Sequence, residues 1–305
     1  MSQSIGAAVL GLGAAAQVHV PGLQSHARFE LVGVASSRPG VAAQVAAERK
    51  VRRAYESWRD AIADPEVSLV VISSAPSLRA AQLAAALAND KHVLVEPPVA
   101  DHPRELDALV HEAGRMGHVA AACLTLRYHP ARQALRELVV NGHLGEARNA
   151  AWRHLSARWN PSIAVHALDV LRWTLGGADR ERVQRLEGEQ SLALQMRHFD
   201  GCLSQLALDG RSATEDLTFT VAGTARVAAV LGDAPDDGEL HVFEGETDDE
   251  YRLRPSRYQR FSAANRRLPA FLELLDDLAA AIDGKTSAVP TLADAAEAQH
   301  LASAL

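Results

Sequence analysis

Short apolar runs alternate with longer segments of helical spacing over the first 123 residues. An apolar run of about four to eight residues indicates a buried strand, whereas a longer Ala- and Leu-rich segment indicates a helix. Strands that alternate with helices in this way predict βαβ units around a parallel sheet. We expect strands at residues 5–11, 31–36, 69–73, 92–95 and 119–123, and helices at residues 15–25, 41–49, 78–88 and 103–116.

The pattern changes after residue 123, where several strand-like runs follow one another. Consecutive strands predict a mostly antiparallel sheet, so the second half of the chain should be α+β. The fold class predicted for the whole chain is α/β. In the second half we expect strands at residues 148–155, 191–199, 202–208, 217–222, 226–231, 239–243 and 251–254, and helices at residues 130–141, 163–175, 269–282 and 292–305.

The turn after the first predicted strand carries a phosphate-binding pattern. Residues 11–16 (GLGAAA) fit G-x-G-x-x-A in the strand–turn–helix context that this motif requires. Gly11 allows the tight turn, and Gly13 lets the backbone approach a pyrophosphate. The following backbone, at Ala14 and Ala15, opens a helix whose free N–H groups and partial positive charge attract phosphate. The turn therefore predicts a dinucleotide site.

The end of the second strand bears on the choice of cofactor. An acidic residue there would bind the ribose 2′-hydroxyl of NAD, but this chain has Ser36, Ser37 and Arg38. The serines can donate hydrogen bonds, and an arginine can pair with a 2′-phosphate. NADP is therefore favoured, with NAD as the alternative. Ser74 and Glu96, which follow the third and fourth strands, complete the residues expected at the cofactor.

Composition and charge exclude several other classes of protein. The 305 residues are 48% hydrophobic and carry a formal net charge of −7, which argues against a nucleic-acid or anionic-membrane partner. No apolar run reaches the roughly 18 residues of a membrane span. The apolar segment at residues 5–16 has no preceding Lys or Arg, as a secretory signal would require. We therefore expect a cytoplasmic protein.

The cysteines and histidines do not predict a metal site. Cys123 and Cys202 lie far apart with no CxxC pair, which argues against a thiolate zinc site and fits a reducing compartment. His154, His166 and Asp169 also fit no zinc spacing.

Several short motifs occur in an order that resembles the Gfo/Idh/MocA family of oxidoreductases, and the match spans nearly the whole chain. The family includes glucose–fructose oxidoreductases and inositol dehydrogenases. The matching segments are GLGAAAQVH at residues 11–19, DPEV at 64–67, KHVLVE at 91–96, RYHP at 127–130, GHLGE at 142–146 and HALD at 166–169.

The resemblance implies two domains and a terminal helix. Residues 1–123 would form an NAD(P)-binding Rossmann domain, and residues 124–290 an α+β domain with a large, mostly antiparallel open sheet. That sheet often forms the oligomer interface in the family, and apolar residues alternate along the run at residues 192–196. We therefore expect a homodimer or homotetramer through this sheet. The C-terminal helix, residues 291–305, is expected to pack back on the Rossmann domain.

The resemblance also implies a hydride-transfer enzyme of the sugar or polyol dehydrogenase type with a small-molecule substrate. His166 is the candidate general base, because its ordinary pKa of about 6.5 suits abstraction of a hydroxyl proton. Asp169, one helical turn later, would orient the imidazole or bind a sugar hydroxyl.

Three positions depart from the family pattern. The lysine of the family's E-K-P triplet is replaced by Pro97, a histidine after the third strand by Arg79, and an aspartate before H-x-x-D by Ser162. Arg79 is the third candidate catalytic residue, because its charge could replace that of the lysine, although it cannot transfer a proton. An arginine there would also suit an anionic sugar or polyol. The alternative function is a non-catalytic NAD(P)-binding relative that acts as a sensor or partner subunit.

Overall fold

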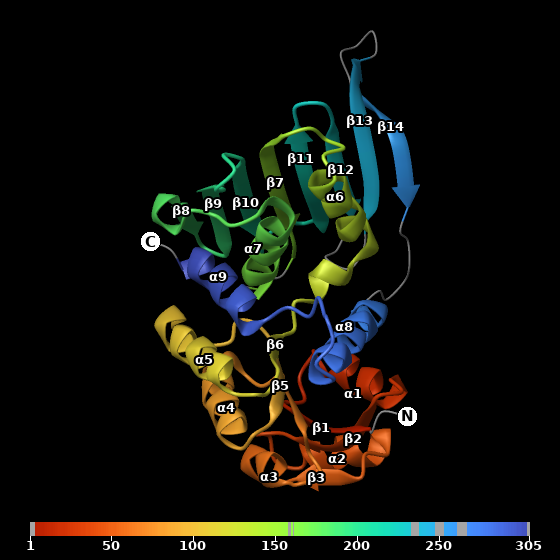
Figure 1. Cartoon of the computed structure of the whole chain (residues 1–305), viewed down its shortest axis with the longest axis vertical. Helices are drawn as coiled ribbons and strands as arrows, with labels where there is room; N and C mark the ends of the chain where they lie inside the picture. Colours follow the sequence, from red (N-terminus) through yellow and green to blue (C-terminus); the bar gives the residue numbers. More distant parts are fainter. Residues whose placement is uncertain are drawn as a thin grey trace. The chain divides into compact units, whose positions relative to one another are not determined.

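The structure is a computed structural model that describes residues 4–157, 160, 162–232, 238–247, 253–260 and 267–303. The chain divides into two compact units (Figure 1). The first unit comprises Met1–Leu124 and Arg267–Glu297, and the second comprises Thr125–Arg266 and Ala298–Leu305.

A parallel sheet forms the centre of the first unit. Its strands are β1 (Ile5–Leu10), β2 (Phe29–Ala35), β3 (Arg53–Tyr55), β4 (Leu69–Ile72), β5 (His92–Val95) and β6 (Ala120–Ala122). They lie in the order β3-β2-β1-β4-β5-β6, and every neighbouring pair is parallel. The order reverses between β1 and β4, and in open α/β sheets ligands bind at the carboxyl ends of the strands beside such a reversal.

Helices and buried strands account for the core of this unit. The middle strands β4 and β5 are almost wholly apolar and buried, as expected when both faces of a parallel sheet are covered. The helices are α1 (Ala16–Ser25), α2 (Val41–Arg49), α3 (Trp58–Ala63), α4 (Pro76–Ala88), α5 (Pro103–Arg115) and α8 (Arg267–Ile282).

Helix α8 belongs to the first unit although it follows the second in sequence. A Cβ atom on Gly22 of α1 would lie 2.5 Å from Cδ1 of Phe271, so the glycine makes room for this ring. Asp283, just after α8, accepts hydrogen bonds of 2.9 and 2.8 Å from Arg28, just before β2. The sequence predicted residues 267–290 as part of the second domain, since nothing local in α8 indicates packing on α1, whereas the structure groups residues 267–297 with the first unit.

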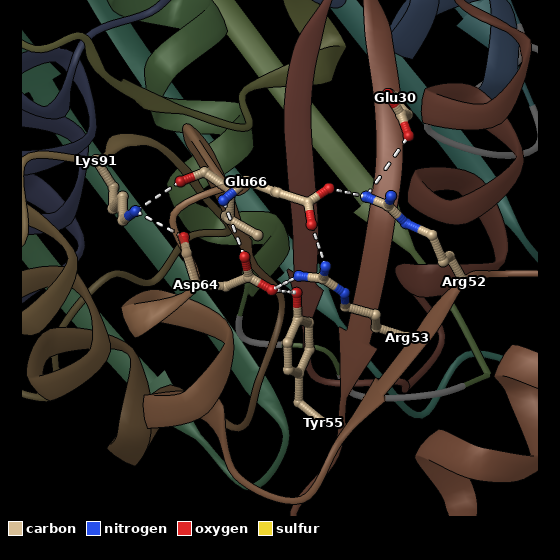
Figure 2. Close-up of polar contacts among 8 residues, drawn as sticks. Glu30, Arg52, Arg53, Tyr55, Asp64, Glu66 and Lys91 are labelled. Atoms are coloured by element: carbon tan, nitrogen blue, oxygen red, sulfur yellow. Dashed lines mark hydrogen bonds and ion pairs between the residues drawn. The ribbon is translucent and has the colours of Figure 1, made fainter.

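The D-P-x-V segment lies in a polar network near the amino end of β4 (Figure 2). The buried Asp64 accepts hydrogen bonds from Arg53, from the Tyr55 hydroxyl at 2.7 Å and from the Glu66 backbone at 2.9 Å. Burial raises the pKa of Asp64, but the hydrogen bonds from Arg53 and Tyr55 outweigh this effect and lower it to about 2. Asp64 therefore ties the edge strand β3 to the loop that precedes β4.

The lysine of KHVLVE lies in the same network (Figure 2). Lys91 Nζ donates to the carbonyl oxygens of Asp64 at 3.0 Å and Val67 at 2.6 Å. Lys91 precedes β5, so this contact is at the end of the sheet opposite the carboxyl ends of the strands. The residue thus supports the fold on the side away from the expected cofactor site.

A second sheet forms the centre of the second unit. Its strands are β7 (Ala147–Leu155), β8 (Gln184–Gly188), β9 (Ser191–Arg197), β10 (Leu203–Asp209), β11 (Asp216–Gly223), β12 (Val227–Gly232), β13 (Glu239–Thr247) and β14 (Leu253–Arg260). They lie in the order β14-β13-β12-β11-β7-β10-β9-β8, and the pairs are antiparallel except β7 with β10. The predicted α/β class with a mostly antiparallel second sheet is confirmed. The strand expected at residues 251–254 begins outside the described residues.

The two faces of the second sheet differ in exposure. Trp152, Phe219 and Leu194 are fully buried on the face that packs against α6 (Pro130–Val140) and α7 (Ser162–Leu175). The opposite face includes Leu203, which is 53% exposed. Short 3₁₀ turns lie at Thr125–Tyr128 (η1) and Arg180–Arg182 (η2), and the last helix is α9 (Leu292–Ser303). No helix in the described part of the chain is long and apolar enough to cross a membrane.

Candidate cofactor and catalytic sites

The glycine turn lies where the strand order of the first sheet reverses. Gly11 follows β1 with a φ of +94°, and a Cβ atom on it would lie 2.4 Å from the backbone nitrogen of Ser74. Ser73, just after β4, donates its hydroxyl to the Gly11 carbonyl at 2.8 Å. Both the backbone conformation and the close contact therefore require glycine here.

The next part of the turn has room for a ligand. A Cβ atom on Gly13 would meet no atom within 4 Å, and Gly13 and Ala14 are exposed. Helix α1 begins at Ala16, and its N-cap residue Ala15 provides no side-chain hydrogen bond. The N–H groups of Gln17, Val18 and His19 donate to the carbonyls of Ala14 and Ala15, and no side chain caps the N–H groups that precede them in the turn. These residues fit the pyrophosphate of a dinucleotide.

Ser36, Ser37 and Arg38 lie beside this turn. Gly11 donates its backbone N–H to the carbonyl of Ala35 at 2.9 Å, which holds the ends of β1 and β2 together. Arg38 Nη2 donates to the Leu12 carbonyl at 2.7 Å, and Ser36 Oγ accepts from the Arg38 backbone at 3.2 Å. The Arg38 guanidinium, which we expect to pair with the 2′-phosphate of the ribose, is thus hydrogen-bonded to the glycine turn itself.

Arg79 has a different environment from that expected of a substrate-binding cation. It is buried on α4, its Nε donates to Ser74 O at 2.9 Å, and its Nη1 donates to Glu96 O at 3.2 Å and Pro98 O at 2.9 Å. These bonds join the loop after β4 to the loop after β5, which contains a cis Pro97–Pro98 peptide. The described contacts of Arg79 therefore support the backbone at the carboxyl ends of the strands.

Glu96 takes part in a cluster that sequence reasoning missed. His19 Nε2 lies 2.8 Å from Glu96 Oε1 and 3.7 Å from Cys123 Sγ. His19 and Cys123 are 2% and 1% exposed. Burial and the Glu96 carboxylate both raise the pKa of the Cys123 thiol well above its ordinary value. The three residues are distant in sequence, and only the parallel order of β1, β5 and β6 brings them together.

In the second unit, Asp169 of α7 pairs with Arg127 of η1. Arg127 donates through Nε to Asp169 Oδ2 at 2.7 Å and through Nη2 to Oδ1. Asp169 is 1% exposed and Arg127 is 8% exposed, so the pair is buried. Both carboxylate oxygens of Asp169 therefore accept from the Arg127 guanidinium, a partner that the sequence did not predict.

His166 lies one turn earlier on the same helix. It is half-buried, whereas its neighbours Val165, Ala167 and Leu168 are buried. Its Nδ1 atom is buried, so the part of the imidazole that is exposed lies away from this nitrogen. The H-x-x-D motif therefore combines one half-buried histidine with one buried carboxylate that accepts hydrogen bonds from Arg127.

A parallel sheet with a glycine turn at its reversal point is the architecture of dinucleotide-binding oxidoreductase domains. Residues 5–122 match the GFO_IDH_MocA model, described as an oxidoreductase family with an NAD-binding Rossmann fold. Over these residues the chain belongs to the Gfo/Idh/MocA family of oxidoreductases.

Individual relatives are distant. An uncharacterized oxidoreductase of Synechocystis sp. is 28% identical over 215 residues, 64% of this chain, and the chain spans only 57% of that protein's length. Trans-1,2-dihydrobenzene-1,2-diol dehydrogenase of Bos taurus is 24% identical over 255 residues, 77% of this chain and 76% of that protein. The solved structure of levoglucosan dehydrogenase with NADH and levoglucosan has a TM-score of 0.85 at 17% identity, covering 99% of this chain and 96% of that one. This likeness shows a shared fold.

Proposed function

We propose that this protein is an NAD(P)-dependent oxidoreductase that moves a hydride between a CH–OH carbon of a small sugar or polyol and nicotinamide. The observation that carries the proposal is the glycine turn at the reversal of the strand order, with Gly11 closely packed and Gly13 open. Two relatives named as dehydrogenases of levoglucosan and of a dihydrodiol support this class of substrate.

We propose NADP as the preferred cofactor. Arg38 contacts the Leu12 carbonyl of the phosphate turn, and no acidic residue occupies residues 36–38. A guanidinium binds a phosphate through charge-assisted hydrogen bonds, whereas a carboxylate would repel it. Replacing Arg38 with Ala should weaken NADPH binding by about 1.5–3 kcal/mol, roughly 10- to 100-fold, and leave NADH binding nearly unchanged.

We propose His166 as the general base of the reaction. When bound, the nicotinamide accepts the hydride from the substrate carbon. The imidazole of His166 takes the hydroxyl proton, so the carbonyl product forms with atoms and charge balanced. Asp169 supports this helix through Arg127, and Arg79 holds the loops after β4 and β5. Because Arg79 donates to backbone carbonyls, the substrate need not be anionic.

The alternative is a non-catalytic NAD(P)-binding relative that acts as a sensor or partner subunit. The observation that favours it is Pro97, which stands where the family's E-K-P triplet has lysine. Loss of an acid–base group typically lowers a rate by roughly 10²–10⁴-fold. Both functions predict binding of NAD(P), but only the enzyme would turn the cofactor over.

Two measurements test the proposal in sequence. Fluorescence titration with NADPH comes first, and absence of binding at millimolar cofactor would exclude both functions. Turnover of NADP against a panel of sugars and polyols then separates the enzyme from the binding protein.

With an active substrate, His166→Ala should lower kcat roughly 10²-fold or more at unchanged NADPH affinity. The exposed His143 of the same unit provides the matched control, and His143→Ala should retain the wild-type rate. Wild-type turnover by His166→Ala would show that His166 is not the base.

A further inference from the structure

A buried set of three metal-ligand side chains lies at the carboxyl ends of β5 and β6. His19 comes from α1, Glu96 directly follows β5, and Cys123 directly follows β6. One ligand atom from each residue lies within 4.8 Å of the other two. Among the described residues, this is the group of His, Cys, Asp and Glu side chains that converges closely enough to bind one ion.

The chemistry of the donors selects the kind of ion. A thiolate, an imidazole and a carboxylate together suit zinc and similar borderline ions, whereas magnesium and calcium prefer oxygen ligands alone. Tetrahedral zinc with bonds of about 2.0–2.3 Å would separate the sulfur from the nitrogen by about 3.6 Å, and the nitrogen from the oxygen by about 3.3 Å. The structure has 3.7 Å between Cys123 Sγ and His19 Nε2, and 2.8 Å between His19 Nε2 and Glu96 Oε1. The sulfur–nitrogen distance already matches, the nitrogen–oxygen distance would lengthen by about 0.5 Å, and the Cys123 sulfur lies within 4.8 Å of the Glu96 ligand oxygen.

Charge points to the nature of a fourth ligand. Binding a divalent ion displaces the Cys123 proton, so the thiolate and the Glu96 carboxylate balance the two positive charges. Arg79 Nη1 donates to the Glu96 carbonyl at 3.2 Å, so its guanidinium adds one positive charge beside the cluster. A buried site favours neutrality, which an anionic oxygen such as hydroxide or alkoxide would supply. Glu96 is the most exposed member at 15%, so this ligand would enter from its side.

We propose that His19, Glu96 and Cys123 form a binding site for a divalent ion of the zinc class, with a fourth position for an anionic oxygen ligand. Three protein ligands with one exchangeable position is the coordination of a catalytic zinc ion rather than of a structural one. All three residues lie in the first unit and outside the glycine turn at residues 11–16, and Glu96 is also among the residues expected at the cofactor.

The surroundings of His19 predict moderate affinity. The Phe271 ring lies 4.8 Å from the His19 ring, which restrains the imidazole. His19 Nδ1 is buried and has no hydrogen-bond partner among the described residues. Metal-binding histidines usually donate this second N–H, and loss of such a bond weakens binding roughly 10- to 100-fold. Dissociation by a strong chelator is therefore expected.

The test is titration of the chelator-treated full-length protein with Co²⁺. A cobalt–thiolate bond gives a near-ultraviolet charge-transfer band, and the sequence contains only two cysteines, Cys123 and Cys202. We expect this band to saturate at one Co²⁺ per chain and to disappear when Zn²⁺ displaces the cobalt. The band should be lost in Cys123→Ser and retained in Cys202→Ser, in which the other buried thiol is removed. The near-isosteric Glu96→Gln should weaken Co²⁺ binding at least 10-fold.

X-ray absorption of the zinc-loaded wild-type protein provides a measurement that needs no variant. One sulfur at about 2.3 Å and nitrogen or oxygen neighbours at about 2.0–2.2 Å would support the site. Absence of the cobalt band in the wild-type protein, or its persistence in Cys123→Ser, would overturn the proposal and leave the cluster as a hydrogen-bonded network. NADPH titration of the metal-free protein separates this outcome from failure of the proposed function.

Discussion

The substitution Asp169→Asn tests whether the H-x-x-D motif is structural at its second position. Asp169 accepts two hydrogen bonds from Arg127, and both side chains are buried. Asparagine keeps the size of the side chain but removes one acceptor and the negative charge that Asp169 places beside the buried Arg127 guanidinium. Removing one partner of a buried ion pair costs about 3–5 kcal/mol. We expect Asp169→Asn to lower the free energy of unfolding of the second unit by that amount.

A more exposed ion pair in the same unit provides the matched control. Asp216 pairs with Arg153, and the Arg153 side chain is 55% exposed. Exposed pairs contribute about 0–1 kcal/mol because water and salt screen them. Asp216→Asn is the same chemical change, and it should cost no more than about 1 kcal/mol.

Urea unfolding followed by tryptophan fluorescence measures both variants. Of the four tryptophans, Trp58 lies in the first unit and those at positions 152, 159 and 173 belong to the second. A Trp58→Phe background therefore reports the second unit. Equal costs for Asp169→Asn and Asp216→Asn would refute the conclusion that the Arg127 pair stabilises α7. Unchanged NADPH affinity would show that the effect is confined to the second unit.

Three further outcomes follow from the geometry. Gly11→Ala should abolish NADPH binding in fluorescence titrations, because the new Cβ atom would lie 2.4 Å from Ser74 N. Gly201→Ala is the control: Gly201 has a similar φ of +93°, but its Cβ atom would meet no atom within 4 Å, so this variant should bind NADPH normally. Asp64 has its pKa lowered to about 2 from 3.8, so its stabilisation is present above pH 3.8 and lost as the pH falls through 2; the stability difference between wild type and Asp64→Asn in urea should shrink over that range. Leu203→Glu on the exposed face of the second sheet should convert a dimer or tetramer to monomers in light scattering, and a monomeric wild type would contradict this interface.

Sequence periodicity predicted the fold where elements are long or fully apolar. The helix expected at residues 41–49 and the strand expected at residues 92–95 have those bounds in the structure. The strand β3 (Arg53–Tyr55) was missed because it is only three residues long and partly exposed, so no apolar run marks it. Helix α3 was also missed, although Ser57 and Asp60 form a capping box that could have indicated its start.

The candidate sites also differ in how far the sequence could predict them. The residues of the phosphate turn are contiguous, so a local motif was sufficient to place Gly11 and Gly13 at the carboxyl end of β1. The cluster of His19, Glu96 and Cys123 joins residues from three distant segments, and the absence of a CxxC pair suggested that no such site exists. Only the strand order brings these three segments together. Residue spacing in the sequence can reveal a metal site formed by one segment, but it cannot reveal a site whose ligands come from several strands of a sheet.

The motifs that reveal the family report mainly on its fold. Asp64 and Lys91 form hydrogen bonds near the amino ends of β4 and β5, and Asp169 accepts from Arg127, so all three of these motif residues make contacts that support the fold. Their retention therefore carries little information about catalysis, because a non-catalytic relative needs them equally. The choice between enzyme and binding protein depends instead on His166 and on the chemistry around Glu96. Pro97 stands where the family has a lysine next to that glutamate, and a divalent ion held by His19, Glu96 and Cys123 would supply positive charge beside the same residue.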